Sequence, residues 1–107
     1  MKDIECAVIE YLDDDLFEPA DVYSAVVHAS EWEPDRCAEI TWLLVDKWLQ
    51  ERAVAVGLYR TLHGVTELSP DDERRAELVD RIVQMKGGSW IVPRLGEWPV
   101  MEFVAPR

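Results

Sequence analysis

The sequence predicts an α+β fold with three N-terminal helices, an additional helix and a C-terminal β-hairpin, in a single domain over residues 1–107. Three observations support this prediction. Apolar residues recur every three or four positions through residues 4–49, as on one face of an amphipathic helix. Short β-branched and aromatic runs follow around turn residues, and a proline-led, acid-rich stretch near residue 70 opens a further helical pattern.

The first two helices are predicted from their apolar stripes and their starting residues. The first spans residues 3–14, with Ile4, Ala7, Val8, Tyr11 and Leu12 as its inner stripe and Glu5, Glu10 and Asp14 outside. The second begins at Glu18–Pro19, because proline suits the first helical turn, and we expect it to end near Ala29 or Ser30. Trp32 then lies in a short acidic connection.

Pro34 opens a third, longer helix, which we expect to be the most buried. Its apolar face comprises Cys37, Ile40, Thr41, Leu44, Val45, Trp48 and Leu49. Residues 53–56 either continue this helix to a left-handed cap at Gly57 or begin a strand, and we expect helix to about Val56. Trp42 and Trp48 point about 120° apart on the helix, which favours partial exposure of one of them.

The second half of the chain is predicted to supply strands and a fourth helix. Residues 58–62 and 65–68 are β-like runs around a His63–Gly64 turn. Ser69 and Pro70 begin a helix that Gly87–Gly88 ends. We expect Leu78, Val79, Ile82, Val83 and Lys86 on its inner face and Arg74, Arg75, Glu77, Asp80 and Arg81 outside. Residues 90–93 and 100–104 are predicted to pair as the C-terminal hairpin, joined by residues 94–99.

The formal net charge of −11 is concentrated in one third of the chain. Residues 1–35 hold eleven carboxylates and one lysine, whereas the rest of the chain carries ten basic and eleven acidic side chains. Acidic surfaces repel nucleic-acid phosphates and attract cationic partners. The charge pattern therefore indicates either a solubilising, solvated face or a docking surface for a basic protein.

Spacing argues against metal sites and recognisable catalysis. Cys6, His28, Cys37 and His63 include no C-x-x-C or H-x-x-x-H pair, so we expect no zinc, and we expect both cysteines to be packing residues. A calcium loop beginning at Asp13 would lack its glycine and its final glutamate. Because no glycine-rich phosphate loop or nucleophile motif is present, the sequence predicts neither a cofactor nor an enzyme.

We expect a cytoplasmic protein without a membrane partner. No apolar run approaches the roughly 20 residues of a membrane span, and the first residues lack a basic stretch followed by an apolar one.

The order of the predicted elements resembles a winged-helix domain with an extra helix before its wing. Gly57, Leu58, Tyr59 and Arg60, followed by a capped helix, Trp90 and a Pro/Gly turn before a last strand, are similar to small uncharacterised winged-helix proteins of high-GC bacteria. This resemblance implies DNA binding, with the third helix in the major groove and the wing against the backbone or minor groove. The charges oppose that function, because residues 34–56 carry three basic and four acidic side chains and phosphate binding needs positive charge.

The sequence therefore predicts a non-enzymatic, acidic protein-binding module of inhibitor, immunity or nucleic-acid-mimic type that engages a basic protein partner. The predicted contacts are Asp13, Asp14, Asp15, Glu18 and Asp21 as a charged patch, with Trp32 as an apolar anchor. The alternative is a dimeric winged-helix transcriptional regulator that binds DNA through Arg60, Arg74, Arg75, Arg81 and Arg94. A third hypothesis is an enzyme whose site carries no known motif. Whether the module itself forms a homodimer is left open.

Overall fold

Helices fill the first half of the chain and strands appear only in the second half, in a computed structural model that describes residues 2–12, 16–60, 64–69, 72–86 and 97–104. The helices are α1 (Lys2–Leu12), α2 (Pro19–Ala29), α3 (Pro34–Gln50) and α4 (Asp72–Met85), and the strands are β1 (Val54–Arg60), β2 (Gly64–Ser69) and β3 (Glu97–Phe103). The predicted α+β class and the four predicted helices are confirmed.

The three strands form one antiparallel sheet in the order β2-β1-β3. β1 and β2 form a hairpin in which Arg60 pairs with Gly64, which confirms the strands predicted around this turn. The predicted last strand is also present as β3, but it begins at Glu97, within the stretch expected to be a loop, and it pairs with β1. Its predicted partner, residues 90–93, lies outside the described residues.

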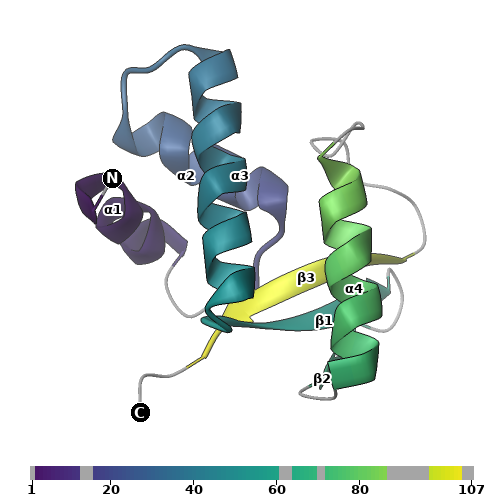
Figure 1. The fold of residues 1–107 in the computed structure, drawn as a ribbon. Helices are drawn as coiled ribbons and strands as arrows, with labels where there is room; N and C mark the ends of the chain where they lie inside the picture. Colours follow the sequence, from purple (N-terminus) through teal and green to yellow (C-terminus); the bar gives the residue numbers. More distant parts are fainter. Residues whose placement is uncertain (1, 13–15, 61–63, 70–71, 87–96, 105–107) are drawn as a thin grey trace.

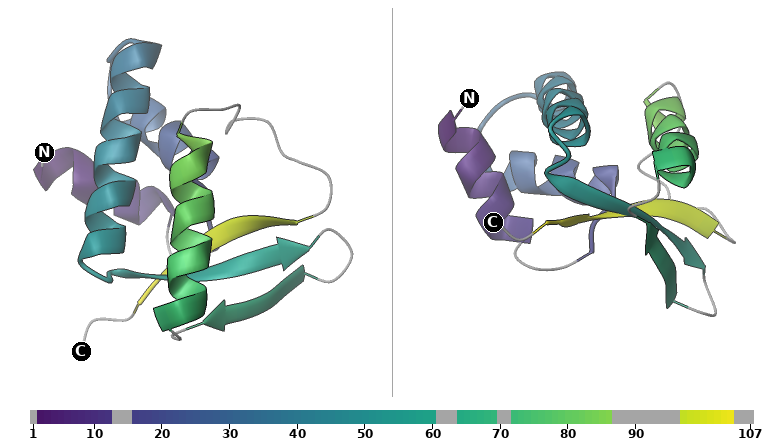
Figure 2. Two further views of the ribbon diagram at one scale, coloured as in Figure 1. Left: turned by 45° about the vertical axis from the view of Figure 1, so that its right-hand side comes forward. Right: turned by 60° about the horizontal axis from the view of Figure 1, so that its bottom comes forward.

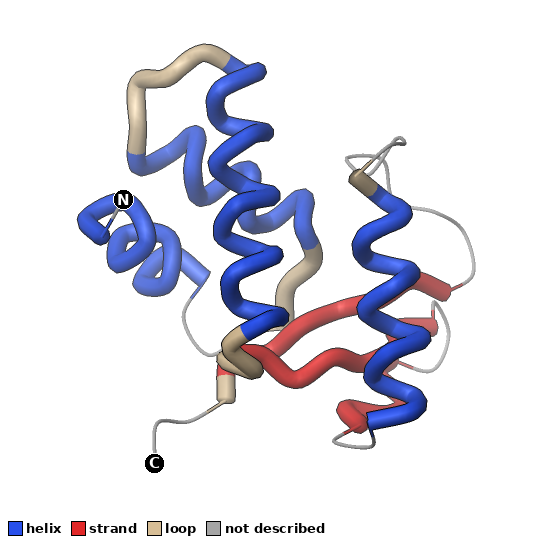
Figure 3. Tube along the Cα trace, in the orientation of Figure 1, coloured by secondary structure: helices blue, strands red, loops and turns tan. Residues whose placement is uncertain are grey.

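The helices lie beside and above the sheet rather than on both of its faces. α3 and α4 rise from the same side of the sheet, and α1 and α2 lie next to α3 (Figures 1 and 2). α1 packs against α2, α2 packs against α3, and α4 contacts the strands. Figure 3 shows the same division, with the helical first half of the chain on one side and the sheet with α4 on the other.

α3 ends at Gln50, so the prediction that it continues to about Val56 is wrong and the strand alternative is correct. A Schellman motif closes the helix: the Ala53 N–H donates to the Trp48 carbonyl at 2.9 Å, and the Arg52 N–H donates to the Leu49 carbonyl at 3.3 Å. Arg52 takes the left-handed position with φ of 55°, a place that usually holds glycine. The expected stop signal at Gly57 therefore lies within β1 instead.

One buried apolar cluster joins all four helices with β1 and β3. At its centre the ring of Phe17 packs against Phe103 and Trp48, with ring centroids 4.9 Å and 6.1 Å away. Phe17 lies between α1 and α2, and its backbone forms an isolated bridge with Met101 through hydrogen bonds of 2.8 Å and 2.7 Å. The connection between the first two helices is thereby attached to the edge of the sheet.

Arg75 is buried, although the sequence pattern placed it on the outside of α4. Its guanidinium donates to the Val54 carbonyl at 2.9 Å and to the Leu49 carbonyl at 3.2 Å. Leu49 is in the last turn of α3, where carbonyl groups lack helical partners and the helix dipole favours a cation. Arg75 therefore links α4 to the junction between α3 and β1.

Further burial predictions differ from the structure, among them Val83 and Lys86, which are expected on the inner face of the fourth helix and are exposed. Cys6 is exposed while Cys37 is buried, and both are free thiols, so only Cys37 is a packing residue. Trp42 and Trp48 are both buried, and Trp42 lines a hollow together with Lys86, the residue that follows α4. Tyr11, expected in the inner stripe of α1, is exposed, and its ring lies beside that of His28 in a tilted arrangement.

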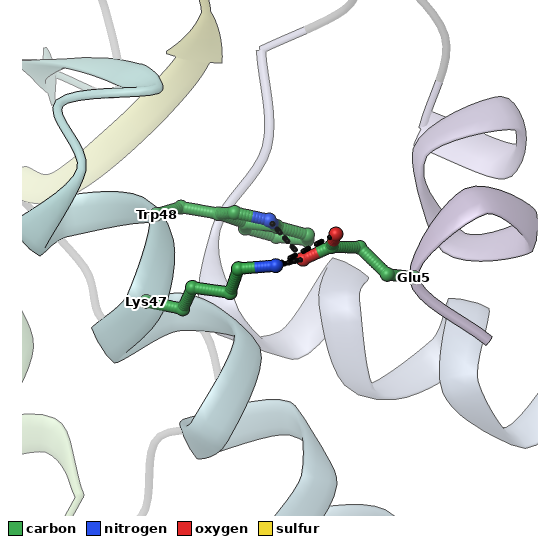
Figure 4. A network of polar contacts seen from close by, with 3 residues as sticks. All are labelled: Glu5, Lys47 and Trp48. Carbon is green, nitrogen blue, oxygen red and sulfur yellow. Dashed lines mark hydrogen bonds and ion pairs between the residues drawn. The ribbon is translucent and has the colours of Figure 1, made fainter. Parts of the chain in front are cut away.

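Glu5 connects α1 to α3 and does not lie on the outer face of α1 as the period suggested. Its carboxylate accepts hydrogen bonds from Lys47 Nζ at 2.8 Å and 2.9 Å and from Trp48 Nε1 at 3.2 Å (Figure 4). The Glu5 side chain is only 18% exposed. The hydrogen bond that Lys47 donates to Glu5 raises the pKa of Lys47 above its ordinary value of 10.5.

We predict that Arg75→Met destabilises the fold. The change leaves the carbonyl groups of Leu49 and Val54 without this donor, which should lower the free energy of unfolding by about 2–4 kcal/mol. Urea unfolding measures the difference. The matched control is Gln84→Met, an exposed position on the same helix, where a change within about 0.5 kcal/mol is expected. Equal stability of the two variants would contradict the proposed role of Arg75.

We also predict that Glu5→Leu lowers the free energy of unfolding by about 1–3 kcal/mol, since the buried Trp48 loses the acceptor for its indole N–H. Glu5→Gln should be milder, because an amide oxygen still accepts that hydrogen bond while the ion pair with Lys47 is lost. Glu10→Gln on the exposed side of α1 is the control and should be close to neutral. Thermal and urea unfolding of the three variants provide the measurement.

The ion pair between Glu5 and Lys47 should also give a pH dependence at alkaline pH. The pKa of Lys47 is raised in the folded protein. The stabilisation is therefore fully present below the ordinary pKa of 10.5, and it is lost as the pH rises through the higher pKa of the folded state. The stability difference between wild type and Glu5→Gln should therefore be constant at neutral pH and should shrink above pH 10.5. A difference that grows with alkaline pH would refute this assignment.

Candidate protein-binding surface

One side of α1 and the connection between α2 and α3 come together around Trp32. We term this surface the Trp32 face, and it consists of Asp3, Ile4, Ala7, Ala29, Ser30, Glu31 and Trp32. Asp3, Ala7 and Tyr11 recur at i, i+4 and i+8 along α1, so they share one side of that helix. The rings of Tyr11 and His28 lie 5.0 Å apart and join α1 to the last turn of α2. Two sections of chain separated in sequence thus present a single surface.

The Trp32 face contains a hollow with a volume of about 310 Å³. The hollow is lined by Asp3, Ile4, Ala7, Ala29, Ser30, Glu31 and Trp32. Its volume is at the lower end of the range for small-ligand pockets, which suits a single side chain better than a folded element. The lining combines apolar residues with two acidic residues that come from different elements.

Trp32 is 43% exposed, yet its backbone is held on both sides. Its N–H donates to Ser30 Oγ at 3.4 Å, and its carbonyl accepts a hydrogen bond from the buried Cys37 thiol at 3.5 Å. Ser30 in turn donates to the Val26 carbonyl at 2.8 Å. The connection therefore positions the indole at the surface through contacts that do not bury it.

A guanidinium already lies over the indole. The central carbon of the Arg36 guanidinium is 5.5 Å from the Trp32 ring centroid, within the range of a cation–π interaction. Arg36 also forms an ion pair with Glu39 at 3.5 Å, and both side chains are more than half exposed. The Trp32 ring is thus a surface on which a planar cation can stack.

Of the predicted charged patch, the structure describes only Glu18 and Asp21, which lie at the other end of α2 from Trp32. Asp13, Asp14 and Asp15 lie outside the described residues. Glu18 and Asp21 form a capping box at the start of α2, where the Glu18 N–H donates to the Asp21 carboxylate at 3.0 Å. From Asp21 to the end of α2 is about 12 Å at 1.5 Å per residue, and Trp32 lies beyond that end.

The acidic residues of the first third have different surroundings in the structure. Glu5 is paired with Lys47, and Asp21 holds a helix cap. Among the described residues, five acids are exposed on or near α1 and the α2–α3 connection: Asp3, Glu10, Glu31, Glu33 and Asp35. Two of these acids, Asp3 and Glu31, line the hollow of the Trp32 face, although sequence counting alone did not single them out. A sequence signal for part of this arrangement is the four-residue spacing from Asp3 to Ala7, which places both residues on one side of α1.

The basic residues of the DNA-binding alternative do not form a described surface. Arg75 is buried against carbonyl groups, and Arg81 is half-buried on α4. The side chains of Arg60 and Arg74 and the whole of Arg94 are outside what the structure describes.

A second hollow of about 350 Å³ lies on α3, lined by Ala38, Glu39, Trp42, Leu43 and Lys86. Leu43 beside it is half-exposed, while Lys86 pairs with Asp46 at 3.2 Å. Within the described residues, no three His, Cys, Asp or Glu side chains are grouped so that they could hold a metal ion.

Over the ranges that the structure describes, no helix has the length and apolar composition of a membrane span. No protein-family model, curated protein or solved structure matches this chain, so the geometry of the described residues is the basis for its functional assignment.

Proposed function

We propose that this chain is an acidic protein-binding module, of inhibitor, immunity or nucleic-acid-mimic type, that engages a basic protein through the Trp32 face. The observation that carries the proposal is the half-exposed Trp32 in a hollow whose lining includes the exposed acidic residues Asp3 and Glu31. Tryptophan is among the residues that most often dominate binding energy at protein interfaces. Carboxylates next to it select a partner of opposite charge.

The net charge supports the same assignment through association kinetics. A formal charge of −11 on 107 residues attracts basic proteins over a range set by the ionic strength and raises the encounter rate. The lifetime of the complex then depends on the few contacts that lose water, for which Trp32 is the strongest described candidate. Asp13, Asp14 and Asp15 remain predicted contributors to the attraction.

We further propose that the frame is winged-helix-like. The order of three helices, a strand pair, a fourth helix and a last strand that returns to β1 supports this assignment. DNA binding receives less support than protein binding. α3, the helix expected in a DNA groove, contains three acidic and two basic side chains and so lacks excess positive charge. Arg75 of α4, one of the predicted DNA contacts, packs inside the fold.

A binding experiment tests the proposal. Proteins retained by the immobilised chain at low salt are identified, and a purified basic candidate is then titrated against variants. We predict that Trp32→Ala weakens binding by about tenfold or more, as for an interface anchor worth at least 1.4 kcal/mol. Glu31→Lys should weaken binding and flatten its dependence on salt, because a charged contact is reversed.

The matched control is the double charge reversal Glu77→Lys with Asp80→Lys on α4, which lies on the other side of the molecule from α1 (Figure 1). It changes the net charge more than Glu31→Lys does, so a larger loss of affinity would show that only total charge matters. Asp13→Lys with Asp15→Lys tests the predicted acidic patch separately. Unchanged affinity in Trp32→Ala would remove the Trp32 face from the proposal.

A further inference from the structure

We infer that the hollow beside Trp32 receives a single arginine side chain of the basic partner, an inference that rests on the proposed function. The hollow of about 310 Å³ lies between the first turns of α1 and the end of α2. Ile4, Ala7 and Ala29 provide apolar walls, and Asp3 and Glu31 provide negative charge. An arginine side chain matches both parts, since its aliphatic stem packs on apolar surface while its head remains charged.

Three features of the hollow favour a bound cation: Asp3, Glu31 and the C-terminal end of α2. Asp3 comes from the first turn of α1, where its charge offsets the positive end of that helix. Glu31 comes from the connection after α2. Ala29 and Ser30 place the C-terminal end of α2 at the hollow, and the carbonyl groups of a helix C-terminus carry partial negative charge. A carboxylate or phosphate group would be repelled at the same position.

Stacking distinguishes arginine from lysine. The Trp32 indole already has the Arg36 guanidinium 5.5 Å from its centroid, so the ring accepts a guanidinium within this chain. Arg36 is not one of the described residues that line the hollow, and we expect the incoming guanidinium to stack on the part of the indole that borders the hollow. A planar guanidinium stacks on an aromatic ring and pairs with a carboxylate through two parallel donors, whereas an ammonium group is a point charge.

The test uses short peptides that each contain one side chain of interest. Acetyl-Gly-Arg-Gly-amide, its lysine counterpart and its uncharged citrulline counterpart are titrated into the full-length ¹⁵N-labelled chain at low salt. We expect the arginine peptide to shift the Trp32 indole resonance and the Ser30 and Glu31 amide resonances, with a dissociation constant on the order of millimolar. The lysine peptide should bind about threefold more weakly or worse, and the citrulline peptide more weakly still.

Variants assign the effect to the hollow. Asp3→Asn and Glu31→Gln should each weaken the arginine peptide about two- to fivefold, the range for an exposed ion pair. Asp35→Asn is the matched control: it removes one charge from the same acidic part of the chain, does so outside the lining, and should change affinity by less than about twofold. Trp32→Ala should abolish the preference for arginine over lysine.

The possible results separate this inference from the proposed function. Equal binding of the arginine and lysine peptides, or equal losses in Asp3→Asn and Asp35→Asn, would overturn the arginine assignment. If a basic protein partner depends on Trp32 while the arginine peptide leaves the Trp32 resonance unchanged, this inference fails and the proposed function stands. If the peptide binds in the hollow but no basic protein depends on Trp32, the proposed function fails instead.

Discussion

The packing of α1 against α2 and α3 is the constraint on which the proposed binding surface depends, since Asp3 and Ala7 reach Trp32 only when α1 is in this place. Ile4, Val8 and Leu12 are buried, and each such side chain contributes about 1.5–3 kcal/mol by leaving water. A net hydrogen bond contributes about 1 kcal/mol. Apolar burial therefore provides most of the stability of this contact. The hydrogen bonds that Lys47 and Trp48 donate to Glu5 specify the orientation of α1 on α3.

Local sequence correctly predicts most of the helices and strands. The structure differs from these predictions where contacts between distant segments override local preferences. Helical period and proline starts correctly predicted the beginnings of α2 and α3 and the buried face of α3. The sequence does not predict the end of α3, because the left-handed residue that ends the helix is Arg52 and such positions usually hold glycine. Arg75 was misplaced because a charged residue is expected outside unless carbonyl groups from distant segments satisfy it.

The candidate site was predicted only in part, because counting charges does not show which carboxylates are engaged. Asp21 and Glu5 add to the same acidic total as Glu31, but one holds a helix cap and the other an ion pair. Trp32 was identified from its place in a connection, whereas Asp3 and Glu31 became significant only once α1 and the α2–α3 connection were placed together. The apolar period of a sequence predicts single helices, but it does not predict which helix and which connection lie side by side in the fold.

The proposed function accounts for the exposed position of Trp32. The core accommodates large rings such as Phe17, Trp42 and Trp48, so the fold can bury an indole where burial is needed. Trp32 instead remains half-exposed, while Ser30 and Cys37 hold its backbone by hydrogen bonds to both the N–H and the carbonyl. Ordering an interface loop costs free energy during association, and a backbone already held in place reduces that cost. Under the proposed function, an exposed indole on a backbone that is already held lowers the free-energy cost of binding a cationic partner.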